Sequence, residues 1–389
     1  MRLPRLGLLP KVIIAIALGV ACGMFFPDWL TRVFLTFNSL FGNFLNFIIP
    51  LLILGLVAPG IAELGKSAGW LLAATALLAY AFTLFSGFMT YGVCSAIFPS
   101  MFGEEGLPEI LQKNGGLLPY FGIDMSPVMG VMSALILAFV LGLGMAYFES
   151  PTLKAAAEQF RNIITGIITG IIIPLLPLYI FGIFLQMTVA GQVADIMGVF
   201  LKLIVLIFFL TVALLVIQFS IAGLVARRNP FKMLRTMLTA YVTALGTQSS
   251  AATIPVTLQQ TLKLGVRKEI AEFVVPLCAT IHLSGSTMKI VACSLAVMML
   301  GGYPISTSTY VGFIMMLGIT MIAAPGVPGG AIMAAVGILQ TMLGFDETMI
   351  GLMIALYIAM DSFGTATNVT GDGAVTVIID KLYGSRHRQ

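Results

Sequence analysis

The sequence predicts an all-α polytopic membrane protein. Of its 389 residues, 59% are hydrophobic and only 9% are charged, which excludes a soluble domain of this length. The apolar residues form long unbroken runs and not the alternating pattern of a β-barrel, and lipid admits only helices or closed barrels. Two carboxylates lie inside the last apolar run, where a charge is costly without a partner or water.

Six apolar runs in the first part of the chain are each long enough to cross a bilayer. They cover about 9–26, 33–61, 70–98, 128–148, 163–189 and 196–226. Many runs follow the first, so we interpret it as a spanning helix and not as a cleaved signal peptide. Pro50 lies in the middle of the second run, where a proline bends a spanning helix without ending it.

Lys and Arg residues set the predicted orientation. They gather at the N-terminus and after the second, fourth and sixth spans, whereas the alternate loops carry few. By the positive-inside rule, the N-terminus lies in the cytoplasm, and the basic tail around Lys381 puts the C-terminus there too. We expect a multi-pass protein of the cell (inner) membrane. The net charge of +4 does not indicate nucleic-acid binding, because the basic residues lie mostly between spans.

The second part of the chain begins with a broken segment at about 237–264. Its centre is small and hydroxylated and ends in Pro255, and basic residues flank both ends. We expect a re-entrant hairpin with Ser249 and Ser250 near its tip, since irregular backbone at membrane depth must line a cavity or be buried in protein. The alternative is a kinked span, which would invert everything after it, and the basic C-terminus argues against that.

The remaining segments repeat this plan. We expect a seventh span at about 271–300 whose helix is unwound near His282, and a second hairpin at about 309–342. The final span holds Asp361 and Asp372. Segments 229–301 and 305–380 thus form inverted repeats that enter from opposite sides, which is how secondary transporters build a midplane site. The predicted architecture is eight transmembrane helices plus two re-entrant helical hairpins.

Four polar residues of the final span share one helix face. Asp361, Thr365, Asn368 and Asp372 are four, three and four residues apart, which at about 100° per residue gives one narrow stripe. The stripe predicts a polar binding site at membrane depth. The alternative is a polar face that only holds neighbouring helices together, but Asn and Thr alone would serve that purpose and Asp is costly.

Four motifs in order give the chain its resemblance to a known family. They are Gln248-Ser-Ser-Ala-Ala-Thr-Ile-Pro-Val-Thr257, Pro276-Leu-Cys-Ala-Thr-Ile281, Gly326-Val-Pro-Gly329 and Asn368-Val-Thr-Gly-Asp372. They resemble the first hairpin, the seventh span, the second hairpin tip and the last helix of the dicarboxylate/amino acid:cation symporters. This family includes glutamate transporters and neutral amino acid transporters. The resemblance implies a homotrimer with an elevator mechanism, in which a transport domain moves against a fixed scaffold.

The resemblance also implies domain boundaries. Residues 1–69 would hold scaffold spans one and two, 70–98 the third span in the transport domain, and 99–190 an extracellular loop with scaffold spans four and five. Residues 191–228 would be the sixth span in the transport domain, and 229–389 the transport-domain core with both hairpins and the last two spans.

Residue roles are carried over where the motifs match. Asp361 with Thr365 would hold a substrate ammonium, and Asn368 with Ser250 its carboxylate. The other substrate-binding candidates are Gly364, Gln248, Ser249, Ser286, Val327 and Gly329. A cation site would use Asp372, Asn368 and backbone carbonyls near Cys278 and His282, hard oxygen ligands that suit sodium. A second cation site would involve Tyr80, Thr83 and Ser284.

Departures from the family pattern shape the functional prediction. Gly364 stands where acidic-substrate members carry Arg, which predicts a small neutral α-amino acid such as alanine, serine or threonine. Lys289 is a cation that could serve acidic amino acids or dicarboxylates instead, which remain the alternative. The sodium-site Asn and Asp of the seventh span are replaced by His282 and Ser284, and Leu84 replaces a Ser.

These replacements bear on the coupling cation, which we expect to be Na⁺ and/or H⁺, with no other cofactor. Histidine, the residue type at position 282, is the side chain suited to proton exchange near neutral pH, and a lysine ammonium near Asp372 would replace a bound sodium ion. We therefore expect fewer coupled sodium ions than in glutamate transporters. The alternative is that Lys289 extends to a water-filled vestibule while His282 only donates a hydrogen bond.

Two other classes of function, a channel and an enzyme, fit the sequence less well. An anion-conducting channel needs no acceptor for an amino group, so Asp361 favours a transporter. An enzyme would use His282 with Ser284 or Ser286. His282 and Ser284 do not face each other on a helix, and no third group in that span orients the His.

Overall fold

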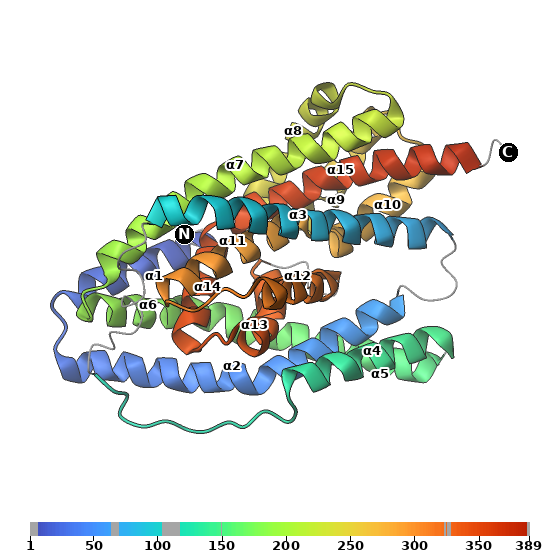
Figure 1. Ribbon diagram of the computed structural model, residues 1–389. Helices are drawn as coiled ribbons and strands as arrows, with labels where there is room; N and C mark the ends of the chain where they lie inside the picture. Colours follow the sequence, from blue (N-terminus) through green and yellow to red (C-terminus); the bar gives the residue numbers. More distant parts are fainter. Residues whose placement is uncertain are drawn as a thin grey trace, which may run out of the picture.

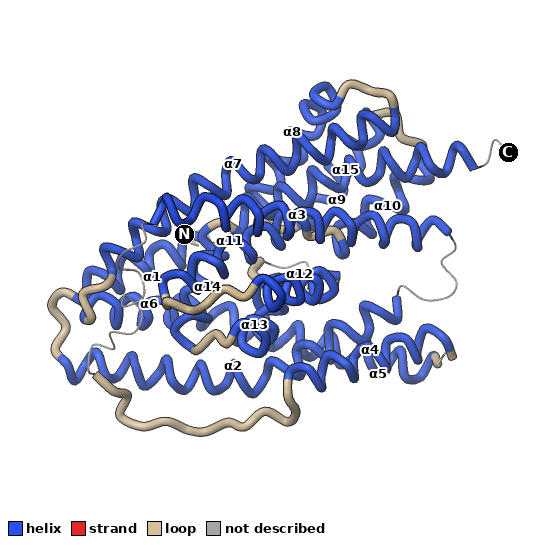
Figure 2. The backbone as a smooth tube through the Cα atoms, viewed as in Figure 1, coloured by secondary structure: helices blue, strands red, loops and turns tan. Residues whose placement is uncertain are grey.

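The computed structural model describes residues 7–63, 70–102, 117–148, 150–322, 324 and 328–386 (Figure 1). Within these ranges all regular structure is helical (Figure 2), as the composition predicts. The first helices are α1 (Leu8–Gly23), α2 (Asp28–Glu63), α3 (Trp70–Phe102), α4 (Val131–Tyr147), α5 (Pro151–Ile167), the π-helical turn η1 (Ile168–Ile172), α6 (Ile173–Val189) and α7 (Val193–Ala226). The later helices are α8 (Pro230–Thr247), α9 (Ser250–Lys263), α10 (Lys268–Ile281), α11 (Ser284–Leu300), α12 (Thr307–Ile322), α13 (Gly330–Leu343), α14 (Glu347–Ala359) and α15 (Asp361–Arg386).

Several helical stretches are long and apolar enough to cross a bilayer. In the described ranges there are five: Asp28–Ala62, Trp70–Met101, Pro151–Val189, Ile196–Ala226 and Lys268–Leu300. Helices α14 and α15, taken together, make a sixth. Helices α1, α12 and α13 and the Ile136–Tyr147 part of α4 are apolar but shorter. The chain is therefore a multi-pass membrane protein, and the count of eight spans plus two hairpins stays a prediction.

The predicted helix breaks are present. Helices α8 and α9 contact each other and are separated at Gln248, whose φ of 52° ends α8. Ser249 Oγ then accepts a hydrogen bond from Ala252 N, which is how a serine begins a helix. Helices α10 and α11 are separated at His282, and α13 begins after Gly329, whose φ is 74°. Gly326 and Val327 of the predicted second hairpin tip lie outside the described residues.

One break was not predicted. The chain forms a separate helix, α14, whose first turn is capped by Asp346 through a 2.8 Å bond from Met349 N to Oδ1. Helices α14 and α15 meet at Met360 with a bend of 60°. Asp361 is therefore the first residue of α15 and lies directly at the bend. The bend leaves backbone carbonyls at the end of α14 free to accept other donors.

Helix contacts form two groups with a connecting set between them. Helix α2 contacts α4, α5 and α6, and α6 contacts α1, while α15 contacts α3, α7, α8, α9, α10, α11 and α14. Helices α12 and α13 contact each other and lie between α2 and α3 (Figure 1). Surrounded in this way, α15 holds its polar stripe inside protein, away from lipid.

Candidate functional site

The predicted stripe of α15 is buried. Asp361, Thr365, Asn368 and Asp372 are only 4%, 7%, 2% and 1% exposed. Helix α15 contacts α10 and α11, the two parts of the broken seventh span, along this stretch. The stripe therefore faces polar groups from another segment of the chain, and each of its carboxylates has found a partner there.

Asp361 is paired with Lys289. Lys289 Nζ lies 3.1 Å from Asp361 Oδ1, and the lysine side chain is completely buried. The ammonium also lies 3.8 Å from the centre of the Tyr357 ring and donates to the carbonyl of Met360 at 3.3 Å. A carboxylate, a carbonyl and an aromatic face each favour a positive charge. A lysine ammonium was expected near Asp372, but in the structure Lys289 is paired with Asp361.

The second oxygen of Asp361 reaches the residue that precedes α13. Gly329 N donates to Asp361 Oδ2 at 2.8 Å. Gly329 is the residue before α13 and adopts a left-handed conformation, which glycine adopts without a steric cost. The two oxygens of Asp361 thus accept hydrogen bonds from two separate parts of the chain, the Lys289 side chain and the Gly329 backbone. Asp361 links α11, the start of α13 and α15.

Gly364 makes room for the lysine. A β-carbon built at this position would overlap Cε and Nζ of Lys289. The acidic-substrate members of the resembled family carry an arginine at this position. Here the positive charge comes from α11 and occupies the space where such a side chain would begin. Gly364 and Lys289 therefore depend on each other sterically.

Asn368 caps the start of α11. Its Oδ1 accepts hydrogen bonds from Gly285 N at 2.8 Å and Ser286 N at 3.4 Å, and its Nδ2 donates to Ser286 Oγ at 3.1 Å. Tyr357 donates its hydroxyl to the same Ser286 Oγ at 3.0 Å. The two helices approach closely, because a β-carbon at Gly285 would lie 2.6 Å from the carbonyl oxygen of Gly364. The structure thus joins two of the predicted binding residues directly.

Asp372 is paired with His282. His282 Nδ1 lies 2.9 Å from Asp372 Oδ1, and both side chains are buried. The backbone N of His282 donates to the carbonyl of Cys278 at 2.9 Å. Because His282 contacts Asp372, the predicted cation-site residues at the end of α10 and on α15 lie close together. Asn368 points its oxygen at α11 instead. No group of three or more His, Cys, Asp or Glu side chains suited to a metal ion occurs in the described ranges.

The side chains of the predicted second cation site bond to different partners, although Ser86 Oγ donates to the carbonyls of both Thr83, at 3.0 Å, and Ser284, at 2.7 Å. Tyr80 donates to the carbonyl of Met315 at 3.4 Å, and Thr83 donates to Ala79 O of its own helix at 2.8 Å. Ser284 Oγ accepts from Gln218 Nε2 at 3.1 Å. Sequence reasoning missed Gln218, although a lone amide in the very apolar sixth span is the kind of residue that marks a functional position.

Ser250, the first residue of α9, lies in the buried region. Ser250 is 7% exposed, and its helix α9 contacts α15. Ser249 caps α9, and Gln248 ends α8 with its left-handed backbone. Thr247 and Thr253 join the two arms through a 2.8 Å hydroxyl contact. The predicted tip residues are therefore local determinants of the turn as well as neighbours of the last helix.

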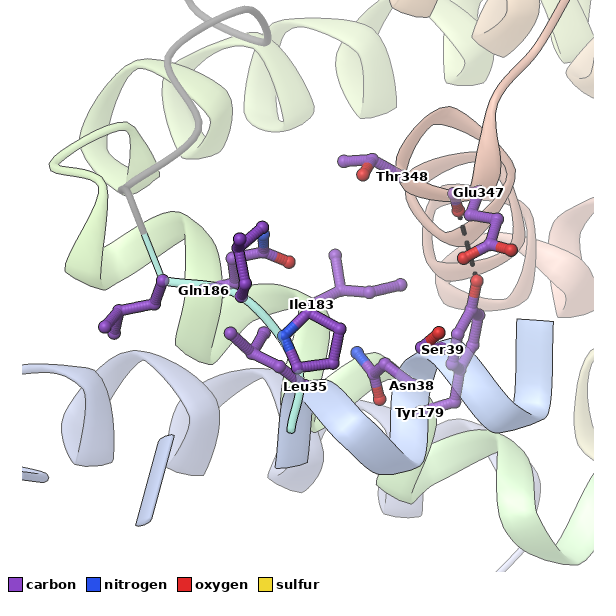
Figure 3. Close-up of a pocket in the computed structure, with 11 residues that line it drawn as sticks. Leu35, Asn38, Ser39, Tyr179, Ile183, Gln186, Glu347 and Thr348 are labelled. Atoms are coloured by element: carbon purple, nitrogen blue, oxygen red, sulfur yellow. Dashed lines mark hydrogen bonds between the residues drawn. The ribbon is translucent and has the colours of Figure 1, made fainter. Parts of the chain in front are cut away.

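A separate polar cavity of about 350 Å³ lies between α2, α6 and α14 (Figure 3). Asn38, Tyr179 and Glu347 line it, and Tyr179 donates its hydroxyl to the carbonyl of Glu347 at 3.1 Å. Glu347 begins α14, whereas Asp361 follows its end. A helix of 13 residues, about 20 Å long, separates the two places, so this cavity is not part of the Asp361 cluster.

Comparison with known proteins agrees with the resemblance in the motifs. Residues 8–382 match the sodium:dicarboxylate symporter family. The chain belongs to this family. Three relatives from Acinetobacter baumannii strains AYE, AB307-0294 and AB0057 are each described as "Serine/threonine transporter SstT". Each is 28% identical over 395 residues, covering 97% of this chain and 97% of the relative.

Membership in this symporter family makes the chain a secondary transporter and excludes the enzyme alternative. The local geometry is consistent with that, since Ser286 bonds to Asn368 and Tyr357, while His282 bonds to Asp372. Family membership also supports a coupling cation, with sodium named in the family description.

Proposed function

We propose that this symporter imports a small neutral α-amino acid of the alanine, serine and threonine class. Gly364 carries the proposal, because no arginine extends from this position to clamp a side-chain carboxylate, which would be costly to bury unpaired. Asp361 is the acceptor for the substrate ammonium. Its buried carboxylate already accepts one ammonium and one amide, which supports this role. The names of the serine/threonine transporter relatives also support it.

The remaining stripe and hairpin residues would hold the substrate carboxylate. Asn368, Thr365, Ser286 and Ser250 are buried and carry amide or hydroxyl donors near the same face of α15. Hairpin tips would act as gates, and the bond from Gly329 N to Asp361 gives the second gate a direct link to the ammonium acceptor. Val327 belongs to the same proposed gate.

We infer that the coupling cation acts at Asp372. Sodium is the first candidate, because the family description names it. The proton is the second candidate, and the pairing of His282 with Asp372 favours it. The presence of His282 and Ser284, where the family pattern has Asn and Asp, supports the expectation of fewer coupled sodium ions than in glutamate transporters.

For the assembly, we propose a homotrimer in the inner membrane, with both termini cytoplasmic and an elevator movement. The division of helix contacts into two groups supports a moving part built around α15 and a scaffold built around α2. The proposed domain boundaries are those of the sequence analysis. Anion conductance as the primary activity is the alternative, and saturable accumulation of substrate against its gradient separates the two.

Acidic amino acids or dicarboxylates are the second substrate class. One observation favours them, the Lys289 ammonium in the space beside Gly364. The test is uptake of labelled serine and alanine into proteoliposomes under an imposed sodium gradient. Unlabelled serine, threonine and alanine should compete, and aspartate, glutamate and succinate should not. The proposal fails if aspartate or succinate competes better than the small neutral amino acids.

A further inference from the structure

We propose that Lys289 is a built-in substitute for the substrate ammonium. It neutralises Asp361 when the carrier returns empty, and it releases that carboxylate when a substrate ammonium binds. The inference rests on the proposed function, because it needs a substrate that carries an amino group. It concerns the return step of the transport cycle, which the substrate class alone does not determine.

The first argument is that the lysine occupies the position assigned to substrate. Lys289 Nζ lies 3.1 Å from Asp361 Oδ1, and Asp361 Oδ2 accepts from Gly329 N. An α-amino acid would present the same chemical group, a primary ammonium, to the same carboxylate. Both oxygens of Asp361 are engaged, one by Lys289 and one by Gly329 N, so a substrate ammonium reaches this carboxylate only by displacing one of these donors. The lysine and the substrate ammonium therefore compete.

The second argument is that an unpaired Asp361 could not cross the membrane core easily. Asp361 is 4% exposed, and a buried carboxylate without a partner is among the most costly groups in a protein. A symporter must return without substrate in every cycle of net uptake. Lys289 gives the empty site a carboxylate that is already neutralised, and no ion from solution has to be bound for this purpose.

The third argument is that Lys289 has other partners when Oδ1 is released. Its Nζ lies 3.3 Å from the carbonyl of Met360 and 3.8 Å from the centre of the Tyr357 ring. The four-carbon stem of lysine allows a small shift toward these groups. The ammonium therefore stays stabilised while the substrate takes its place on Asp361.

The experiment compares two transport modes of reconstituted protein. Exchange of internal for external labelled serine uses only the loaded carrier, whereas net uptake into serine-free vesicles also requires the empty return. In Lys289→Met, net uptake should fall by about a hundredfold relative to exchange measured in the same vesicles, because an unpartnered buried charge must cross only in net uptake. Lys289→Arg keeps the charge and should retain net uptake. Lys268→Met removes a lysine from the exposed pair with Glu272 and is the matched control.

Equal loss of exchange and net uptake in Lys289→Met would overturn the inference, since a structural or direct binding role predicts that result. Unchanged net uptake would overturn it too. Wild-type protein provides a second test if the variant does not fold. Net uptake by wild type should be unaffected when internal potassium is replaced by N-methylglucamine, and a requirement for an internal metal cation contradicts the inference. The competition assay judges the substrate class separately, because it uses wild type and does not depend on the return step.

Discussion

A β-carbon at Gly364 on α15 would overlap the ammonium end of Lys289 on α11. Gly364→Ala should therefore force Lys289 away from Asp361 and lower the initial rate of serine uptake by more than about tenfold, because the buried ion pair is disrupted. Gly166→Ala in α5 is the control, since nothing lies within 4 Å of a β-carbon there. Normal uptake by Gly364→Ala would show that the lysine does not need this space.

Moving the positive charge from α11 to α15 should change selectivity. Gly364→Arg alone creates a clash with Lys289, so the useful variant is Gly364→Arg combined with Lys289→Ala. Its guanidinium can bind a side-chain carboxylate in a bidentate manner, so aspartate should become a better competitor than serine. The measurement is competition against labelled substrate in proteoliposomes. If the double variant keeps the wild-type order of competitors, position 364 does not determine the substrate class.

Removing either partner of the Asp361–Lys289 pair should destabilise the protein. Asp361→Asn or Lys289→Met leaves a buried charge without its counter-ion, a loss of about 3–5 kcal/mol. The double variant removes both charges and should be more stable than either single variant. Thermal unfolding of the purified protein in detergent measures this. If the two losses simply add in the double variant, the pair is not energetically coupled.

Comparing Gly329→Ala with Gly344→Ala should distinguish a loss of stability caused by the backbone conformation from a loss of serine affinity. Gly329 and Gly344 have nearly the same left-handed φ, 74° and 72°, so an alanine at either position costs about 1–2 kcal/mol. Only Gly329 donates its N–H to Asp361. Both variants should unfold at similarly lowered temperatures, but only Gly329→Ala should weaken serine binding. Equal serine affinities in the two variants would argue against a gate at Gly329.

The coupling cation can be tested by imposing sodium and pH gradients separately. An inward sodium gradient should drive serine accumulation by wild type, and an inward proton gradient should add to it. In His282→Asn the proton-driven part should disappear, because an asparagine paired with Asp372 cannot take up a proton. Steep sodium dependence with no response to pH, unchanged in His282→Asn and Lys289→Met, would contradict the expected reduction in coupled sodium ions.

The helix breaks and the polar stripe were predictable because their signals are local. Small, hydroxylated and Gly/Pro-rich residues mark the breaks at Ser249 and Gly329, and the spacing of Asp361, Asn368 and Asp372 alone puts them on one face. The Asn368 contact with Ser286 fits the roles implied by the resemblance.

The partner of Lys289 was not predictable in the same way. It lies 72 residues away in sequence, and the pairing depends on how α11 is rotated against α15 and on the missing side chain at Gly364. Helix α14 was missed because its apolar run continues into Met360 without a glycine or proline to mark the bend. Tertiary contacts determine both features, and the periodicity of the sequence does not reveal them.

The close approach of Gly285 to Gly364 joins the start of α11 and the polar face of α15 into one stiff unit. A ligand held between these two helices would keep the same partners whether the site opens to the outside or to the inside. Its intrinsic affinity would then be equal on both membrane faces. Any asymmetry between loading and unloading would have to arise in the two hairpins and in the cation at Asp372.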